Sequence, residues 1–252
     1  MKKLACTTIL ALILSVTTTA SRGAELLLAA NNWPPYVDSG LPGHGLAIQI
    51  VTEALKRAGY TNRLTIQDWS RSLEGGLIGV YDALAAAWYT EARAEVFSFS
   101  EPYLFNEIRF IKKRGLPLTF SNMSDLDGLR IGVVLNYAYG SDFDDARNFM
   151  RVPQQHIIQN LLMLGKGDIA LTLGDTRAIE FQLQEFMDSN VSRFEFLPKP
   201  VSTRGLRFAV SKDRPDHEEV IAAFNKAIAA MQADGSYDKI LAGYDSPPVG
   251  KK

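Results

Sequence analysis

The sequence predicts an α/β protein in which helices flank mostly parallel sheets. Strand-like and helix-like segments alternate from residue 24 onward, and this alternation is typical of parallel sheets covered by helices. A Gly-x-x-Asp turn followed by an apolar strand also occurs twice, as GVYDALAAAW at 79–88 and as GKGDIALTLG at 165–174. The repeat indicates two similar lobes.

The first half of the chain begins with the apolar run ELLLAA at 25–30. This run predicts a buried strand that ends before Pro34-Pro35. Apolar residues then recur at helical spacing from Leu46 to Ala58, and Gly59 is placed to cap that helix. The remaining expected elements are a strand around 64–66, a short helix from about 70, and strands at 82–88 and 108–112.

The second half continues the alternation. The helix at 176–187 is the clearest element, because Ile179, Leu183 and Phe186 fall on one face. The other expected elements are strands at 129–135, 168–173, 194–197 and 206–211, helices near 142–149 and 155–164, and a long helix carrying Val220 to Met231 with Gly235 as its cap.

A polar residue follows each copy of the repeated strand. Thr90 lies eight residues after Asp82, and Asp175 lies seven residues after Asp168. Ligands of open α/β sheets bind beyond the carboxyl ends of the strands. If the two lobes face each other, the loops that carry Thr90 and Asp175 therefore face each other across a cleft.

The N-terminal segment has the layout of a secretory signal peptide. Two lysines precede an apolar stretch from Leu4 to Val16, and small residues follow it. Cleavage after Ala20 or after Gly23 satisfies the small-x-small rule. The alternative is an N-terminal membrane anchor, but the stretch is shorter than the ~20 residues that span a bilayer. We therefore expect residues 1–23 to be removed and the mature chain to be exported.

Composition argues against several kinds of site. Cys6 is the only cysteine and lies in the signal segment, so we expect no disulfide, reactive thiolate or cysteine-ligated zinc in the mature chain. His44, His156 and His217 are scattered without ligand spacing, so no metal is expected. The formal net charge is −1 and there is no basic block, which argues against a nucleic-acid partner. Nucleophile and phosphate-loop motifs are also missing, so we expect no cofactor and no catalysis.

Arg93 stands between apolar segments in the stretch AAWYTEARAEVFSF. Thr90 follows a strand, so we expect it to cap a short helix with Glu91 in the first turn. The free N–H groups at such a helix start attract an anion, and an arginine one turn later can hold a carboxylate through two hydrogen bonds. The alternative is a solvated arginine paired with Glu91 or Glu95. The spacing alone leaves both interpretations open.

Several stretches resemble the solute-binding proteins of polar amino-acid ABC transporters. The most specific block is 69–103, where W-x-R-x-L and G-x-Y-D-A-L precede YTEARAE and FSFSEPY. In that family a strand ends in Thr-x-x-Arg, and Phe-Ser-x-Pro-Tyr follows several residues later. NNWPPY at 31–36, DLDGLRIGV at 125–133 and FNKAIAAMQADGSYDKIL at 224–241 resemble further segments of the family.

The resemblance implies a two-lobed periplasmic-binding-protein fold. In that fold each lobe is a mostly parallel sheet flanked by helices, two crossover strands join the lobes, and the ligand binds in the cleft between them. By this pattern residues 24–111 and 203–245 form the first lobe, residues 112–202 form the second, and residues 246–252 are a flexible tail.

The resemblance also implies a ligand site in the first lobe. Arg93 matches the family's arginine that binds the α-carboxylate of the ligand, with Thr90 at the start of its helix. Trp33 and Tyr36 match the aromatic loop after the first strand, and Trp69 lies at the cleft edge. Closure of the lobes on a zwitterion would bring one cation, one anion and an aromatic wall together.

The second lobe departs from the family pattern in its acid. Asp175 is the nearest match to the acid that takes the ligand's amine, but it falls two residues late, so Thr172 competes for this role. Arg71 offers a second cation near Trp69, or it pairs with Glu74 on the helix surface.

The pocket is also more aromatic than the family pattern. Trp88 stands where many members have a small hydroxyl residue, and the segment 136–139 (Asn-Tyr-Ala-Tyr) stands where members carry Gly-Thr or Gly-Ser. Trp88 and Tyr137 either stack on a flat ligand or fill space, and we expect Tyr139 to fill space.

The implied function is periplasmic binding of a small carboxylate-bearing solute, an amino acid or a derivative, for delivery to an inner-membrane ABC permease. We expect a monomer that is not an enzyme. One alternative is a dehydratase-like enzyme that acts on a prephenate-type acid, with Glu101 or Asp175 as the general acid beside Arg93. Another is a binding protein that signals to a membrane sensor.

Overall fold

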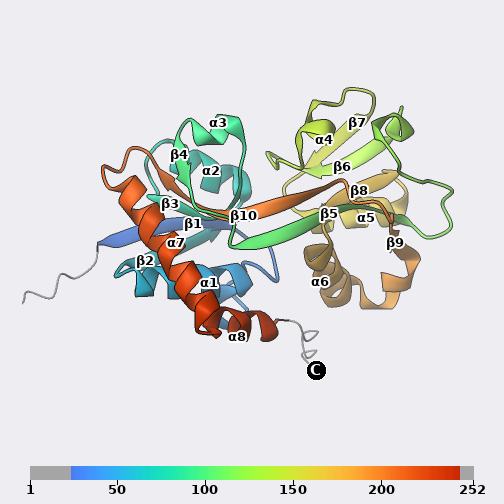
Figure 1. The fold of residues 1–252 in the computed structure, drawn as a ribbon. Coiled ribbons are helices and arrows are strands. Elements are labelled where there is room, and N and C mark those ends of the chain that lie inside the picture. Colours follow the sequence, from blue (N-terminus) through green and yellow to red (C-terminus); the bar gives the residue numbers. More distant parts are fainter. Residues whose placement is uncertain (1–23, 245–252) are drawn as a thin grey trace, which may run out of the picture.

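A computed structural model describes residues 24–244, which form one mixed sheet of ten strands with helices packed against it (Figure 1). The strands are β1 (Glu25–Asn31), β2 (Thr61–Gln67), β3 (Ala83–Trp88), β4 (Phe97–Phe99), β5 (Leu104–Lys113), β6 (Arg130–Val134), β7 (Met150–Gln154), β8 (Leu171–Asp175), β9 (Phe194–Phe196) and β10 (Ser202–Ser211). The α-helices are α1 (Leu46–Arg57), α2 (Trp69–Leu77), α3 (Glu91–Ala94), α4 (Ser141–Asp145), α5 (Ile157–Lys166), α6 (Thr176–Met187), α7 (His217–Ala233) and α8 (Ser236–Ala242). The expected signal peptide at 1–23 and tail at 246–252 lie outside the described residues.

The sheet has the order β2-β1-β3-β10-β5-β8-β6-β7, with β4 beside β10 and β9 beside β5. Strands at the two ends pair in parallel, β2-β1-β3 in the first lobe and β8-β6-β7 in the second. Between them the long strands β5 and β10 run antiparallel to each other and to their other neighbours. These two strands pass through both lobes, which confirms the predicted two-lobed fold with two crossover strands (Figure 1).

The first lobe is a three-layered arrangement. Side chains of β1 alternate between two faces. Leu26 and Leu28 join a core that contains α1 and α7, whereas Ala29 joins a separate cluster with Trp69 of α2. Figure 1 shows α7 and α1 on one side of the sheet and α2 on the other. Both faces are therefore covered, and the carboxyl ends of β1 and β3 remain available at the edge toward the second lobe.

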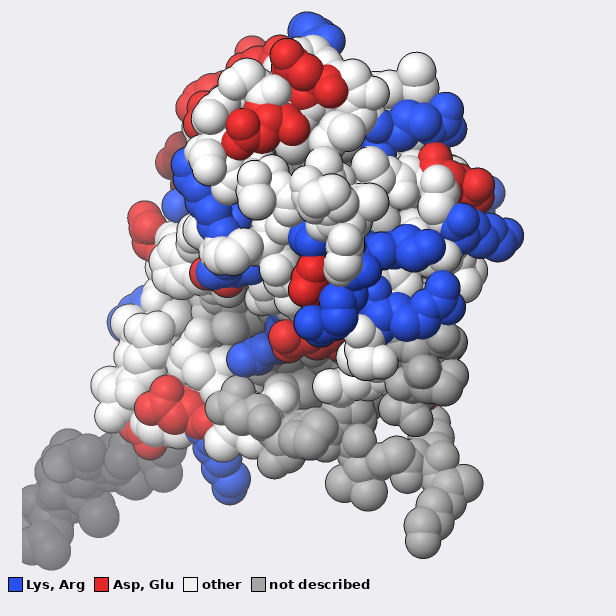
Figure 2. All heavy atoms as spheres, turned by 90° about the vertical axis from the view of Figure 1, so that its right-hand side faces the viewer, with Lys and Arg blue, Asp and Glu red and all other residues white. Residues whose placement is uncertain are grey.

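The second lobe is covered by α5 and α6, whose apolar faces pack on β5, β8 and β9. Figure 2 shows the end of the molecule formed by this lobe, where basic and acidic side chains are interspersed. Lys112 of β5 and Arg114 both form ion pairs with Glu195 of β9, at 2.6 and 3.3 Å. This face therefore has mixed charge instead of a uniform sign.

Two sequence expectations need correction, and three elements were not predicted. The helix near 142–149 ends at Asp145, and residues 150–154 form β7, an edge strand in which Pro153 is tolerated because only one side is paired. The strand expected at 168–173 is β8 at Leu171–Asp175, so Asp175 ends the strand instead of lying in the next loop. The short elements β4 and α8 were not predicted, because three to seven residues carry too little periodicity.

Gly45 fixes the start of α1 against the loop that carries Trp33. Its φ of 100° and ψ of 167° lie in a region that only glycine occupies readily. A Cβ there would lie 2.5 Å from the Tyr36 carbonyl oxygen and 2.9 Å from the Pro35 carbonyl oxygen. Those two carbonyls accept hydrogen bonds from the first N–H groups of α1, so the close approach is what joins the helix to the loop.

We predict that Gly45→Ala destabilises the protein by about 3 kcal/mol, from backbone strain and overlap with the Tyr36 carbonyl. Gly59→Ala is the matched control, because Gly59 has a φ of 87° but a Cβ there would meet nothing within 4 Å. Its expected cost is about 1 kcal/mol. Urea unfolding measures both free energies, and equal costs for the two variants would contradict the account.

Candidate functional site

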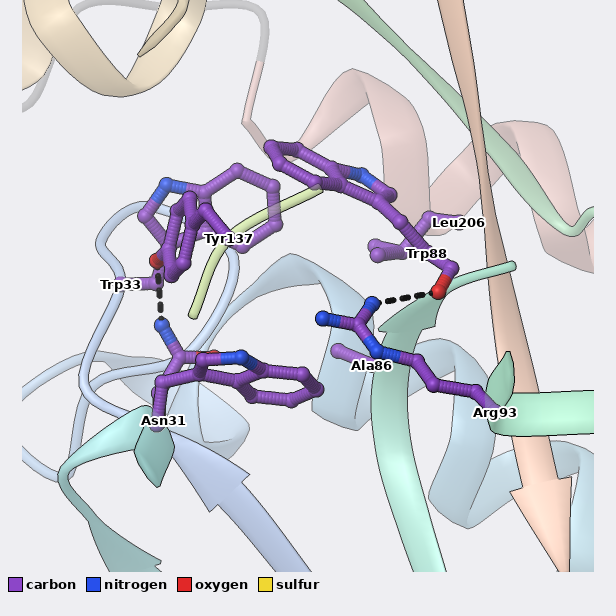
Figure 3. Close-up of a pocket in the computed structure, with 8 residues that line it drawn as sticks. Asn31, Trp33, Ala86, Trp88, Arg93, Tyr137 and Leu206 are labelled. Carbon is purple, nitrogen blue, oxygen red and sulfur yellow. Dashed lines mark hydrogen bonds between the residues drawn. The ribbon is translucent and has the colours of Figure 1, made fainter. Parts of the chain in front are cut away.

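A small pocket lies where the strand ends of the first lobe meet the Asn136–Tyr139 segment of the second (Figure 3). Its cavity volume is about 20 Å³, far below the ~300–1,000 Å³ usual for ligand sites, so the lining side chains nearly fill it in this form. Its walls come from β1, the loop after β1, α2, β3, α3, the second lobe and β10. The lining residues are Asn31, Trp33, Trp69, Ala86, Trp88, Arg93, Tyr137 and Leu206.

Arg93 enters this pocket from α3, one helical turn after β3 ends. Oγ1 of Thr90 accepts a hydrogen bond from the Arg93 backbone N–H at 3.1 Å, which confirms Thr90 as the helix cap. The alternative of a solvated arginine paired with Glu91 or Glu95 is wrong, because Arg93 is only 8% exposed and no described carboxylate forms an ion pair with it. The charge of Arg93 is therefore directed inward.

The Arg93 guanidinium is held by backbone carbonyls from both lobes. Nη1 donates to the Trp88 carbonyl oxygen at 2.6 Å, and Nη2 donates to the Asn136 carbonyl oxygen at 2.8 Å (Figure 3 shows the first). Nε1 of Trp69 donates to the same Asn136 oxygen at 2.9 Å, and the guanidinium lies 4.9 Å from the centre of the Trp69 ring. Both of these hydrogen bonds of the guanidinium thus go to neutral oxygens.

The electrostatic environment of Arg93 is unfavourable to its charge. Burial, and then the positive charge of Arg204, lower the pKa of Arg93 to about 10. Asp144 opposes this shift without touching the guanidinium. A shift in this direction means that the site, as it stands, stabilises the cation less well than water does.

Four aromatic rings surround the pocket. Tyr137 of the second lobe stands edge-on to three tryptophans of the first lobe, with ring centroids 6.5 Å from Trp33, 6.3 Å from Trp69 and 5.3 Å from Trp88. Its hydroxyl accepts a hydrogen bond from Asn31 Nδ2 at 2.7 Å, as Figure 3 shows. Tyr137 therefore fills the space between the tryptophans when the lobes are in contact.

Tyr139 lies deeper than Tyr137 and packs against Trp88 and Phe143. Its hydroxyl accepts a hydrogen bond from the Val134 N–H at 2.8 Å, and burial raises its pKa well above the usual value. The expectation that Tyr139 fills space agrees with this position.

Asp175 does not line the pocket. One carboxylate oxygen accepts hydrogen bonds from the Ala178 N–H and the Tyr36 hydroxyl, both at 2.9 Å, and the other accepts from Asn106 Nδ2 at 3.2 Å. It thereby caps α6 and links the first-lobe loop to the second lobe. Burial raises the pKa of the Asp175 carboxyl, and the three hydrogen bonds oppose that shift only in part.

Thr172, the competing second-lobe residue, is also outside the pocket lining. It is fully buried in β8, and its hydroxyl donates to the Gly132 carbonyl oxygen of β6 at 2.9 Å. Thr172 therefore has a structural role, because its hydroxyl links the neighbouring strands β8 and β6.

Two other predicted residues lie at the periphery. Tyr36 packs on Trp33 with ring centroids 4.4 Å apart and reaches Asp175 with its hydroxyl, so it supports the pocket wall from behind. Arg71 is exposed on α2 and does not line the pocket. The ion pair with Glu74 is also absent among the described residues, so neither interpretation of Arg71 agrees with the structure.

Sequence reasoning missed Asn31, Ala86, Leu206 and the Asn136 carbonyl. Asn31 is the last residue of β1, so the rule that ligands bind at strand ends could have indicated it. Leu206 lies on a crossover strand far along the chain, and the Asn136 contact is made by the backbone. Neither of these carries a side-chain signal in the sequence.

Within residues 24–244 no three His, Cys, Asp or Glu side chains gather in a way that would hold a metal ion. Across the same residues, no helix combines the length and apolar character needed to cross a membrane.

Comparison with known proteins gives a family match over residues 27–246, to bacterial extracellular solute-binding proteins, family 3. The ABC transporter arginine-binding protein 1 of Escherichia coli K12 is 29% identical over 162 residues, which span 64% of this chain and 64% of that protein. The L-cystine-binding protein TcyJ of the same strain is 25% identical over 226 residues, 85% of this chain and 80% of that protein.

Solved structures share the fold at low identity. The amino acid ABC transporter substrate-binding protein AbpA from Streptococcus pneumoniae, bound to L-arginine, matches with a TM-score of 0.74 at 18% identity, over 90% of this chain and 97% of that one. A histidine kinase sensor domain with similarity to periplasmic binding proteins matches with a TM-score of 0.74 at 18% identity, over 89% and 97%.

The match to the family covers nearly all of the described chain, including both lobes, the two shared strands and the pocket between them. It confirms the resemblance that the block at 69–103 indicates. The chain belongs to the bacterial extracellular solute-binding proteins, family 3.

Proposed function

We propose that the chain is a periplasmic protein that binds an amino acid or a related carboxylate between its lobes and delivers it, as a monomer, to an inner-membrane ABC permease. The observation that carries this proposal is Arg93, a buried arginine at the cleft with no carboxylate partner among the described residues.

The physical argument begins with the cost of burying an unpaired charge. A guanidinium taken out of water needs compensation, and backbone carbonyls supply only part of it. A carboxylate offers two parallel charge-assisted hydrogen bonds, which are shorter and stronger than those to neutral oxygens. A ligand carboxylate that replaces the Asn136 carbonyl at Nη2 would therefore bind favourably.

Ligand entry requires the lobes to separate. Tyr137 fills the middle of the pocket, and the Asn136 segment covers Arg93. Few polar contacts hold the lobes together in this region. Hydrogen bonds join Tyr36 to Asp175, Asn31 to Tyr137, Trp69 and Arg93 to the Asn136 carbonyl, and Asn136 to Ser70, and His156 Nε2 lies 3.2 Å from Asp68 Oδ1. Each such contact contributes about 0.5–1.5 kcal/mol, so a ligand can shift the balance between open and closed forms.

The ligand's ammonium group has two sources of attraction. The tryptophan rings offer π faces to a cation, and Asp175 acts electrostatically on Tyr137 from behind the pocket wall. The carboxylate of Asp175 already accepts three hydrogen bonds, so we propose that it attracts the amine through its field and holds Tyr36 in place, rather than by direct contact.

The names of the relatives support the same ligand class. Arginine and cystine, the ligands in the names of the two Escherichia coli relatives, are both α-amino acids. They share a carboxylate next to an ammonium group and differ in the rest of the molecule. The aromatic residues Trp88 and Tyr137 are therefore our proposal for the residues that select the side chain.

The enzyme alternative lacks a suitable acid at the pocket. Glu101 has a side chain that is 83% exposed, and Asp175 is outside the lining residues. A signalling role has more support, since a histidine kinase sensor domain shares the fold. That likeness concerns the fold alone, so delivery to a permease remains the function that we propose.

We predict that Arg93→Gln weakens amino-acid binding by roughly 30-fold or more, because the ligand carboxylate loses a buried charged partner. The ligand is chosen first by a thermal-shift screen of the standard amino acids and L-cystine, and its affinity is then measured by calorimetry. Arg63→Gln is the matched control, since Arg63 is exposed on β2 and, within residues 24–244, forms an ion pair with Glu25 alone. Unchanged affinity in Arg93→Gln, with the fold intact by circular dichroism, would overturn the site.

We predict a distinct pH dependence for Asp175→Asn. Burial raises the folded-state pKa of Asp175 above its unfolded value of about 4. The folded protein therefore binds the proton of this carboxyl more tightly, and the resulting contribution to the free energy of unfolding is present at low pH and is lost as the pH rises through the folded-state pKa. The variant should therefore gain stability relative to the wild type between pH 4 and pH 7. Urea unfolding at several pH values measures this difference, and a difference that is constant or of opposite slope would contradict the account.

A further inference from the structure

A second arginine, Arg204 of β10, stands beside the pocket. Residues two apart on a strand share a face, and Leu206 of the same strand lines the pocket. Arg204 is also paired directly across the sheet with Asn106 of β5, whose side chain accepts a hydrogen bond from Trp88 Nε1 at 2.9 Å. Its position in the sheet therefore directs Arg204 toward the cleft.

The hydrogen-bonding capacity of Arg204 is only partly used. Nη2 donates to the Tyr89 carbonyl oxygen, whereas Nε is buried and has no partner in the described chain. Buried donors of charged groups are normally satisfied. The missing partner of Nε is consistent with a group that arrives from outside the chain.

No described carboxylate neutralises Arg204 by contact. Asp144 is near enough to act on both Arg204 and Arg93, but its two oxygens accept the Tyr139 and Gly140 N–H groups at 3.3 and 3.0 Å. The positive charge of Arg204 is also, after burial, a cause of the lowered pKa of Arg93. One ligand carboxylate at Arg93 would leave the second cation without a partner.

Closure of the lobes encloses this second arginine. The Ser202 hydroxyl, two residues before Arg204, donates to the Tyr139 carbonyl oxygen of the second lobe. Gly140 lies so close that a Cβ there would be 3.2 Å from Ser202. The Tyr139–Gly140 segment thus covers this part of β10. Because little water reaches a covered site, an anion beside Arg204 would be attracted more strongly there than in water.

We propose that Arg204 is a second anion-binding residue and that the ligand carries two anionic groups, as a dicarboxylic amino acid does. One carboxylate binds Arg93 and the other binds Arg204. This inference rests on the proposed function, because it requires a ligand in the cleft between the lobes.

The test uses L-glutamate and L-glutamine, which have nearly the same shape but carry a distal carboxylate and a distal neutral amide, respectively. Calorimetry on the wild type should give an affinity for L-glutamate about tenfold or more above that for L-glutamine. Arg204→Gln should lower the affinity for L-glutamate by about tenfold or more and change that for L-glutamine by less than about threefold. Arg207→Gln is the matched control, because this neighbour on β10 bonds to the Ser100 carbonyl outside the pocket and should bind both ligands as the wild type does.

The outcomes separate this inference from the proposed function. If Arg93→Gln abolishes binding of both amino acids but Arg204→Gln leaves L-glutamate affinity unchanged, or weakens both amino acids equally, the second anion site is wrong and the proposed function stands. The inference also fails if the wild type binds a monocarboxylic amino acid but neither L-glutamate, L-aspartate nor glutarate. Normal binding by Arg93→Gln would instead overturn the site at Arg93, and a wild type that binds no amino acid or related carboxylate would overturn the proposed function.

Discussion

The burial of the positive charge of Arg93, where the two lobes meet, is the interaction on which the other features of this structure depend. The guanidinium is removed from water, so every neighbouring group must either accept its hydrogen bonds or reduce its cost. The carbonyl of Trp88 does so from β3, the carbonyl of Asn136 does so from the second lobe, and Trp69 offers its ring face. The cap by Thr90 holds the arginine at this point. In this closed form the charge therefore takes partners from both lobes.

We propose that the Asn136 carbonyl occupies the place of a ligand carboxylate in this closed form. Asn136 has a φ of 60°, a left-handed conformation that asparagine adopts more readily than most residues. Its carbonyl bonds to both Arg93 and Trp69. Under the proposed function a ligand carboxylate displaces this oxygen, so the measured association constant is the intrinsic one multiplied by the fraction of molecules that are open. The same competition keeps the charge from being left unpaired in the absence of ligand.

Local patterns in the sequence predict the helix cap by Thr90, because its parts are close along the chain, whereas the inward direction of Arg93 was indicated by the family resemblance and not by spacing. Thr90 and Arg93 are three residues apart, and the strand before them and the helix that they begin have clear signals. The role of Asp175 could not be predicted in the same way, since its partners Tyr36 and Asn106 are 139 and 69 residues away. The fold class and most elements follow from periodicity, whereas β7 does not, because an edge strand that contains Pro153 has no alternating apolar pattern. Arg71 shows that nearness in sequence can also mislead. It is only two residues from Trp69, but residues two apart on a helix do not face the same way, and Arg71 is exposed on α2.

The most direct measurement is a crystal structure of the protein with its amino acid bound. The account predicts that both carboxylate oxygens lie about 2.7–2.9 Å from guanidinium nitrogens of Arg93, and that the Asn136 carbonyl no longer accepts from Nη2. A ligand bound elsewhere, with the hydrogen bond between Arg93 and Asn136 intact, would contradict it.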